Sequence, residues 1–468
     1  MNYISTRGTA PKLGFDDVLL AGLARDGGLY LPETWPKLSP ETIRGFKGKP
    51  FADIAVEVIH PFTGGTISRT DLQRMANDAY ASFGHPAIVP LVQLKPNLYI
   101  LELFHGPTLA FKDVAMQLLA RLMDHVLEKR GQRATIVGAT SGDTGGAAIE
   151  AFRSSKRVDV VILFPDGRVS DVQRRMMTTP TEKNVHAVAV KGTFDDCQAV
   201  VKAMFNDHAF RDRVELSGVN SINWARIVAQ VTYYFSAAAQ LGAPDNAVTF
   251  SVPTGNFGDI FAGYVARRMG LPIKQLIIAS NENDILPRTV ETGSYEMKGV
   301  VATSSPSMDI QISSNFERYL FEASGRDAGL IRGFMKDLGD KKRFDLGPVW
   351  QVLKTEFAAS AASEKDVADC IRTTKQQHGY VLDPHSACGV VAADRAGESE
   401  GDVVVLATAH PAKFPDAIQT ITGARPGLPK RLANLMTDPE RFEVLANDLA
   451  GVERFVEHAL APRAKATT

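Results

Sequence analysis

The chain has 468 residues, 44% of them hydrophobic and 22% charged, which is typical of a globular protein with a large buried core. Its 52 basic and 53 acidic residues leave a formal net charge of −1, so no overall field attracts nucleic acid or an anionic membrane. Cys197, Cys370 and Cys388 are far apart and form no CxxC pair, which argues against a disulfide framework or a zinc site and favours a reducing compartment.

The length of the chain predicts about three domains. No apolar run approaches the ~20 residues that span a bilayer, and the first residues lack the apolar segment of a secretory signal. We therefore expect a cytoplasmic protein with no membrane or nucleic-acid partner. The balanced charge is compatible with either a monomer or a homodimer.

Residues 1–95 are predicted to form a mostly helical accessory domain. Turns such as Gly27-Gly28 and Gly64-Gly65 separate amphipathic stretches, of which residues 51–59 are the clearest. These stretches carry apolar residues at helical spacing.

From about Leu98, short runs of branched apolar residues alternate with segments of helical periodicity. This alternation predicts parallel α/β architecture, with helices covering both faces of each sheet. The expected strands are residues 135–137, 158–164, 185–190, 247–252, 277–278 and 403–406, and the expected helices begin near residue 145 or span about 195–205 and 259–269. Ligands of such sheets bind at the carboxyl ends of the strands.

The segment 105–113, HGPTLAFKD, leads into a strong helix pattern that ends at Gly131. Lys112 is expected in the first turn, behind the apolar residues 109–111. Positive charge at a helix N-terminus and partial burial both lower the pKa of an amine, and the neutral amine is the nucleophile of lysine chemistry. The competing interpretation is a solvent-exposed lysine.

The segment 138–146, GATSGDTGG, follows a predicted strand and opens a helix. Successive backbone N–H groups at such a junction bind anions, and the hydroxyls of Thr140, Ser141 and Thr144 are suited to a carboxylate. The segment is neither a P-loop nor a GxGxxG motif. The competing interpretation is a simple helix N-cap.

The segment 253–259, PTGNFGD, is a second strand–loop–helix junction, and its glycines suit a phosphate dianion. The competing interpretation is an ordinary loop that ends in an aspartate cap. Two anion-binding loops indicate either a ligand with two anionic ends or two ligands.

The segment 406–414, LATAHPAKF, follows the last predicted strand and points Thr408 into the same region. His410 is a candidate general base, although a packed structural histidine is the competing interpretation. The histidines form no HExxH motif, no GxSxG elbow is present, and the basic residues form no nucleic-acid-binding cluster.

Taken in order, HGPTLAFKD, GATSGDTGGAA, PTGNFGD and ATAHPAKF resemble the threonine synthases, as do YISTRG and RDGGLYLPE near the start. The resemblance runs from residue 3 to about residue 414. It implies the α/β fold of the fold type II pyridoxal-phosphate enzymes, with two parallel-sheet domains after a helical N-terminal domain. The expected boundaries are 1–95, 96–240 for a smaller domain with the Schiff-base lysine, and 241–468 for a larger domain with the cofactor-phosphate loop.

The resemblance also implies a role for each matching residue toward pyridoxal 5′-phosphate and the substrate. Many relatives in the wider fold carry asparagine at the position of Asp143, which is therefore a departure from that pattern. The implied roles are cofactor attachment and catalysis for Lys112, contact with the cofactor 3′-oxygen for Asp143, the cofactor phosphate for Gly255, Asn256, Phe257 and Gly258, the pyridine nitrogen for Thr408, the substrate carboxylate for Ser141 and Thr144, and the substrate phosphate for Asn223 and Arg226.

The implied reaction converts O-phospho-L-homoserine and water to L-threonine and phosphate, by elimination followed by addition of water at the β-carbon. The nearest alternative is a threonine or serine dehydratase, which would lack the second phosphate pocket of Asn223 and Arg226. Two further alternatives are a catalytically silent paralogue that senses a ligand and a nucleotide-binding regulatory protein. No metal ion is expected.

Overall fold

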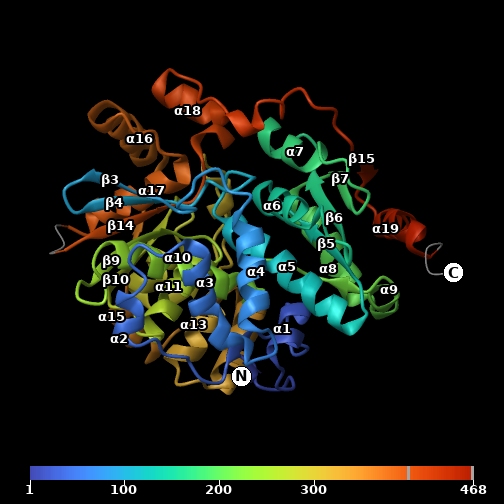
Figure 1. The fold of residues 1–468 in the computed structure, drawn as a ribbon, viewed down its shortest axis with the longest axis horizontal. Helices are drawn as coiled ribbons and strands as arrows, with labels where there is room; N and C mark the ends of the chain where they lie inside the picture. The colour runs from blue at the N-terminus through green and yellow to red at the C-terminus, as the bar shows by residue number, and fades with distance from the viewer. Residues whose placement is uncertain (398–400, 465–468) are drawn as a thin grey trace.

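The computed structural model describes residues 1–397 and 401–464, and two parallel sheets organise it (Figure 1). The larger sheet has six strands in the order β13-β10-β9-β14-β4-β3, of which only the β3–β4 pair is antiparallel. Its strands are β3 (Leu91–Lys95), β4 (Leu98–Glu102), β9 (Val248–Pro253), β10 (Ile273–Ser280), β13 (Phe357–Ala361) and β14 (Val403–Ala407).

The smaller sheet has five parallel strands in the order β15-β7-β6-β5-β8. They are β5 (Ala134–Ala139), β6 (Val158–Pro165), β7 (Val185–Lys191), β8 (Leu216–Ser217) and β15 (Glu443–Ala446). Alternate side chains of β6 enter two different cores: Val161 and Leu163 pack on one face, and Val160 and Ile162 on the other. Burial on both faces explains why these strands read as continuous apolar runs.

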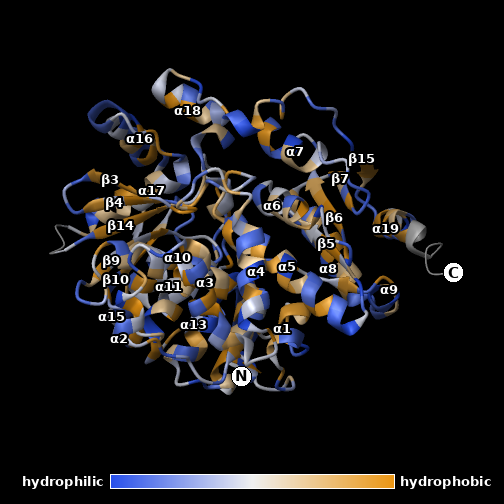
Figure 2. Ribbon diagram, viewed as in Figure 1, coloured by the Kyte–Doolittle hydropathy of each residue, from blue (hydrophilic) through white to orange (hydrophobic). Residues whose placement is uncertain are grey.

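Helices cover both faces of each sheet, as the sequence predicts (Figure 1). The larger sheet packs against α10 (Trp224–Gln240) and α11 (Gly258–Arg268) on one face, and α16 (Glu364–His378), α17 (Pro384–Arg395) and α18 (Pro415–Thr422) on the other. The smaller sheet packs against α5 (Lys112–Arg130), α6 (Asp143–Phe152) and α7 (Asp171–Thr178), and on its far side against α8 (Phe194–Asn206), α9 (His208–Arg213) and α19 (Leu449–Ala464). The strands are largely hydrophobic and polar residues gather at the periphery (Figure 2).

The N-terminal region is mostly helical, as expected, and a short antiparallel strand pair accompanies the helices. It packs on α5 and α10 and shares their apolar core. Its elements are β1 (Tyr3–Ser5), β2 (Tyr30–Pro32), α1 (Phe15–Ala21), α2 (Pro40–Arg44), α3 (Phe51–Ile59), η1 (His60–Thr63) and α4 (Arg69–Tyr80).

The remaining elements lie between β10 and β13 or between β14 and β15 in the chain. They are α12 (Ile285–Thr292), β11 (Ser294–Glu296), η2 (Pro306–Met308), α13 (Phe316–Ala323), α14 (Ala328–Lys341), β12 (Arg343–Asp345), α15 (Val349–Glu356), η3 (Pro411–Lys413) and η4 (Lys430–Leu432). In the part of the chain that the structure describes, no helix is both long and apolar enough to cross a bilayer.

The sheets do not divide the chain at the boundaries expected from the sequence. β3 and β4 belong to the larger sheet, whereas the expected boundaries put β3 in the N-terminal domain and β4 in the smaller one. β15 and α19, near the end of the described chain, belong with the smaller sheet. Strands are placed by pairing rather than by chain order, and local sequence carries no record of which partner a strand will find.

Candidate active site

A cavity lies beyond the carboxyl ends of β5, β9 and β14, where ligands of parallel sheets bind. Its volume is about 80 Å³. The residues that line it are Phe111, Lys112, Asp143, Thr144, Ser221, Arg226, Gln230, residues 253–259, Ser307, Met308, His385, Thr408 and Ala409.

Most residues singled out in the sequence meet in this cavity. Lys112, Asp143, Thr144, Arg226, Gly255, Asn256, Phe257, Gly258 and Thr408 all line it. Ser141 and Asn223 are not among the lining residues. The side chain of Asn223 is engaged elsewhere: its oxygen accepts from Ala225 N–H at 2.9 Å and caps α10, while its amide donates to the carbonyl of Leu19 at 2.9 Å.

Lys112 is the first residue of α5 and only 8% exposed, so the solvent-exposed interpretation is wrong. Its Nζ donates to Oδ2 of Asp143 at 3.2 Å. Burial lowers the pKa of Lys112; Asp143 opposes this shift, and the cations Lys413 and Arg226 add to it. The result is an amine that loses its proton more readily than an ordinary lysine.

Asp143 is a buried carboxylate, 4% exposed, with donors on both oxygens. Oδ1 accepts from Gln173 Nε2 at 3.0 Å and pairs with Lys413 at 2.6 Å, while Oδ2 accepts from Ser307 Oγ at 3.1 Å as well as from Lys112. Burial alone would raise the pKa of this carboxyl, but the two lysines hold it well below its usual range. Asp143 is therefore ionised at neutral pH.

The loop between β9 and α11 presents the start of a helix to the cavity. Phe257, the residue before the helix, has a left-handed backbone with φ of 61°, and no side chain of the described residues caps the helix start. A Cβ added to Gly255 would lie 2.8 Å from the carbonyl oxygen of Ser307, so a glycine is needed there. An uncapped helix start with a glycine-rich approach suits a phosphate group.

The aspartate-cap interpretation of this loop is wrong. The side chain of Asp259 turns to α10 instead, where the hydroxyls of Tyr233 and Tyr234 donate to its Oδ1, that of Tyr234 at 3.1 Å. Its Oδ2 is buried without a hydrogen-bond partner among the described residues. Burial raises the pKa of Asp259 to about 7.

Arg226 lies in the first turn of α10 and is 2% exposed, so it is not a surface arginine. Its Nη1 donates to the carbonyl of Val219 at 3.0 Å, while its Nε has no partner in the described structure. Burial lowers its pKa to about 10. No ion pair with a carboxylate is found for Arg226 among the described residues, and a buried cation without a counter-ion is suited to bind an anion.

Thr408 follows β14, and its backbone is held on both sides: its N–H donates to Ser386 Oγ at 3.1 Å and its carbonyl accepts from Phe111 N–H at 2.8 Å. Nearby, His385 contributes a side of the cavity that the sequence pattern did not reveal. Its Nε2 accepts from Ser307 N–H at 3.2 Å and its Nδ1 lies 2.9 Å from Asp383. These partners put the ring proton on Nδ1.

His410 is a structural residue and does not line the cavity. Its Nδ1 accepts from Ala412 N–H at 3.1 Å and its ring packs edge-on against Phe104. Burial lowers its pKa to about 4, so it is neutral at pH 7. The packed-histidine interpretation therefore fits the structure better than the general-base interpretation.

Comparison with known proteins agrees with this site. The family model for the threonine synthase N terminus matches residues 2–80, that for pyridoxal-phosphate-dependent enzymes matches residues 86–409, and that for the threonine synthase C-terminal region matches residues 386–456. The chain is 50% identical to threonine synthase of Pseudomonas aeruginosa, across 97% of this chain and 98% of that protein. The chain belongs to the threonine synthase family.

Solved structures of the family share the whole fold. The structure of pyridoxal-phosphate-bound threonine synthase from Brucella melitensis is 60% identical and covers 98% of this chain and 99% of its own, with a TM-score of 0.96. Threonine synthase from yeast is 38% identical over 98% of this chain and 99% of its own, with a TM-score of 0.93. The fold type II expectation is thus confirmed, and the chain is a pyridoxal-phosphate-dependent enzyme.

The cavity fits that cofactor on its own features. A buried lysine with a lowered pKa can hold the aldehyde, and the uncapped start of α11 can hold the phosphate. No hydrogen bond to the Thr408 hydroxyl is found among the described residues, which leaves it available to a ring nitrogen. In a threonine synthase the cofactor and the substrate each bring a phosphate. The cavity holds both the start of α11 and Arg226, for which the described part of the chain supplies no carboxylate partner.

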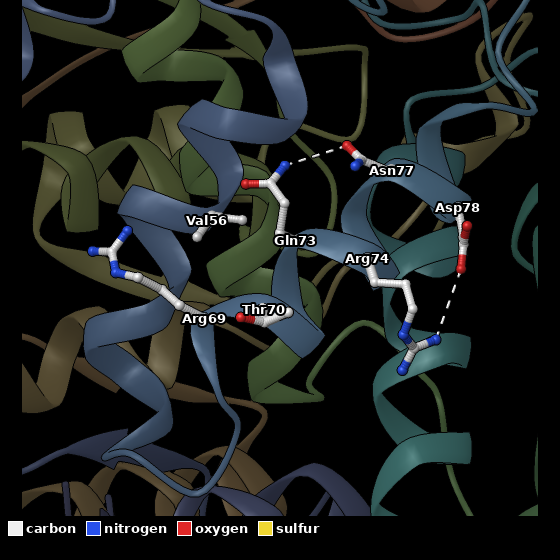
Figure 3. A pocket seen from close by; sticks show the side chains of 7 residues that line it. All are labelled: Val56, Arg69, Thr70, Gln73, Arg74, Asn77 and Asp78. Atoms are coloured by element: carbon white, nitrogen blue, oxygen red, sulfur yellow. Dashed lines mark hydrogen bonds and ion pairs between the residues drawn. The ribbon is translucent and has the colours of Figure 1, made fainter.

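A separate groove of about 540 Å³ lies on the surface between α3 and α4 (Figure 3). Its charged and amide side chains are engaged with their own neighbours: Gln73 donates to Asn77 at 3.2 Å, Arg74 lies 3.9 Å from Asp78, and Arg69 pairs with Glu57 outside the figure at 2.7 Å. This groove shares no lining residue with the cavity at the strand ends, and its charged side chains are all in ion pairs.

Proposed function

We propose that this chain converts O-phospho-L-homoserine and water to L-threonine and phosphate, the last step of threonine biosynthesis. The observation that carries the proposal is the presence of Arg226, a buried guanidinium with no carboxylate partner among the described residues, in the same cavity as Lys112 and the phosphate-type loop. A dehydratase would need only the loop, because its substrate carries no phosphate.

The proposed residue roles follow from position and charge. Lys112 holds the cofactor and, as a neutral amine, takes the α-proton of the substrate. Thr144 lines the cavity and binds the substrate carboxylate, with Ser141 beside it in the same loop. Residues 255–258 bind the cofactor phosphate, and Arg226 binds the phosphate of the substrate through charge-assisted hydrogen bonds.

Asn223 takes a different part from the one its sequence context implies. It caps α10, and Arg226 N–H donates to its carbonyl at 3.1 Å within the same turn. We assign it to the orientation of Arg226 rather than to contact with phosphate.

Pyridoxal phosphate, when bound, supplies the electron sink that makes the α- and β-protons of the amino acid removable. Thr408 would donate to the ring nitrogen through its neutral hydroxyl and would thereby moderate the sink. Lys112 then carries protons between the α-, β- and γ-carbons, and the arginine holds the phosphate as it leaves. Burial of Lys112 and Asp143 keeps bulk water away from these transfers.

The finer parts of the proposal are a small-molecule substrate without nucleic-acid or membrane partner, a cytoplasmic location, and a monomer or homodimer. The balanced charge and the scattered cysteines support them. We also propose that the chain divides into an N-terminal helical unit and two α/β units.

The test is incubation of the purified enzyme with O-phospho-L-homoserine, followed by assays for phosphate, threonine and 2-oxobutyrate. Threonine and phosphate in equal amounts are expected. Formation of 2-oxobutyrate would support the dehydratase instead, and absence of turnover with bound cofactor would support a silent paralogue. Lys112→Ala should abolish both turnover and the visible absorption of bound cofactor.

A further inference from the structure

Asp143 is shared by two lysines, and only one of them has a role in the proposed function. Lys112 lies at its Oδ2, 3.2 Å away, and Lys413 lies at its Oδ1, 2.6 Å away. Lys413 belongs to η3, after β14, so it reaches the carboxylate from a segment far along the chain. The shorter of the two ion pairs is the one without an assigned purpose.

Lys413 is buried inside the protein and held by two acceptors. It is 1% exposed, and its Nζ also donates to the carbonyl of Thr108 at 2.9 Å. Thr108 in turn is fixed by Asp113, which accepts from its N–H at 2.7 Å and from its hydroxyl at 2.6 Å. The ammonium is thus held between Asp143 and the loop that leads into Lys112.

A buried lysine is costly unless it is paired, so the arrangement needs a reason. When Lys112 is the neutral amine that its proposed role requires, it offers Asp143 no positive charge. The other partners of Asp143 are the neutral donors Gln173 and Ser307. Without Lys413, a buried carboxylate left with neutral donors alone would take up a proton.

The same ammonium also acts on Lys112. Competition for one carboxylate weakens the hold of Asp143 on the Lys112 proton, and the repulsion between two nearby ammonium groups favours the neutral form of one of them. Lys413 has the shorter ion pair and a second acceptor, the carbonyl of Thr108. Lys112 has the longer ion pair and a lowered pKa, and it is the group that loses its proton more readily.

We propose that Lys413 is a positioning residue with two effects: it keeps Asp143 a carboxylate when Lys112 is neutral, and by competing for that carboxylate it leaves the amine of Lys112 free to act as a base and nucleophile. The inference rests on the proposed role of Lys112, and it gives a part to Lys413, which has none in the proposed function. Lys413 is not among the residues that line the cavity; it acts from behind Asp143, which does line it.

Five other charged or titratable groups surround the two lysines, Lys112 and Lys413. They are Arg226 of α10, His385 of α17, Asp259 of α11, Asp113 of α5 and Asp143 of α6. Arg226 acts on Lys112 in the same direction as Lys413, whereas Asp143 acts against both. A change at Lys413 alone therefore leaves in place Asp143, which raises the pKa of Lys112, and Arg226, which lowers it.

The experiment compares Lys413→Met with Lys413→Arg, the first removing the charge at similar length and the second keeping it. In cofactor-free protein, the reaction rate of Lys112 with a small acylating reagent is measured from pH 6 to 11 by mass spectrometry of its peptide. Lys413→Met is expected to raise the midpoint of this titration by ~1 pH unit or more. Lys413→Arg is expected to leave it close to that of the wild type.

An unchanged or lowered midpoint in Lys413→Met would overturn the inference, because a merely structural lysine would not move it. If Lys413→Met does not fold, Lys413→Gln provides the same uncharged comparison with a polar side chain. Asp143→Asn should move the midpoint the opposite way, and failure to do so would also count against the inference. The readout needs no substrate, so a failure to form threonine would refute the proposed function and leave this result standing.

Discussion

Replacement of Arg226 by methionine should strengthen the fold of the ligand-free protein while it weakens the binding of phosphate ligands. Burial lowers the pKa of Arg226 from 12.5 to about 10. At about 1.36 kcal/mol per pH unit, the ionised guanidinium costs the folded chain about 3 kcal/mol relative to the unfolded chain. This cost is fully present at pH 7, because the guanidinium is protonated in both states there, and it fades only as the pH passes these two values.

Methionine removes this cost and fills similar space with an apolar chain. It also strands the carbonyl of Val219, which loses a hydrogen bond of 3.0 Å from Arg226, at a cost of about 1 kcal/mol. The expected net gain is about 2 kcal/mol, which corresponds to an increase of a few degrees in Tm. Loss of a charge-assisted hydrogen bond, about 1.5–3 kcal/mol, should weaken substrate binding by about 10- to 150-fold.

Two assays on the same preparations test the expected gain in stability and the expected loss of substrate affinity. Thermal melting of cofactor-free protein is followed by fluorescence, and KM and kcat for O-phospho-L-homoserine are measured with saturating cofactor. Arg226→Lys is the matched control, since it keeps a cation but loses the forked donors. The reasoning is refuted if Arg226→Met melts below the wild type and also retains the wild-type KM.

Three further variants address other parts of the site. Gly255→Ala should weaken cofactor-phosphate affinity at least tenfold in a fluorescence titration, because its Cβ would lie 2.8 Å from the carbonyl oxygen of Ser307; unchanged affinity would show that the loop yields. Asp259→Asn should raise Tm more at pH 8 than at pH 5, because burial raises the pKa of Asp259 to about 7. Ionisation of this carboxyl therefore costs folding free energy that grows as the pH rises from the pKa of the unfolded chain to about 7. An equal effect at both pH values would contradict this. His410→Asn, which keeps an acceptor for the η3 start, should change kcat less than about threefold and leave the pH profile unmoved; a lost limb of the profile would restore the general-base role.

The sequence predicted those parts of the site that depend on local pattern. A strand followed by a glycine-rich loop and a helix marks an anion site in any chain, so the loops at residues 138–146 and 253–259 could be found without a structure. The position of Lys112 in the first helical turn could be found in the same way, and the structure confirms it.

The parts that escaped prediction depend on contacts between distant segments. Lys413 meets Asp143, His385 meets Ser307, and no periodicity in the sequence records such meetings. Asn223 is a different case, because an asparagine directly before a helix pattern is a recognisable N-cap. This local pattern is sufficient to predict the capping role, whereas the family resemblance implies contact with the substrate phosphate.

The strand order of the larger sheet has a consequence for how the chain folds as it is synthesised. β14 lies between β9 and β4, and its Val403 pairs with Leu98. At about 5–20 residues per second, the β3–β4 hairpin therefore leaves the ribosome on the order of 15–60 s before β14, its parallel partner in the described structure, exists. During that time an apolar strand edge is open to any other chain. The sheet that carries the active site is closed by one of the last strands to be made, so the newly made chain depends on protection of that edge until synthesis is nearly complete.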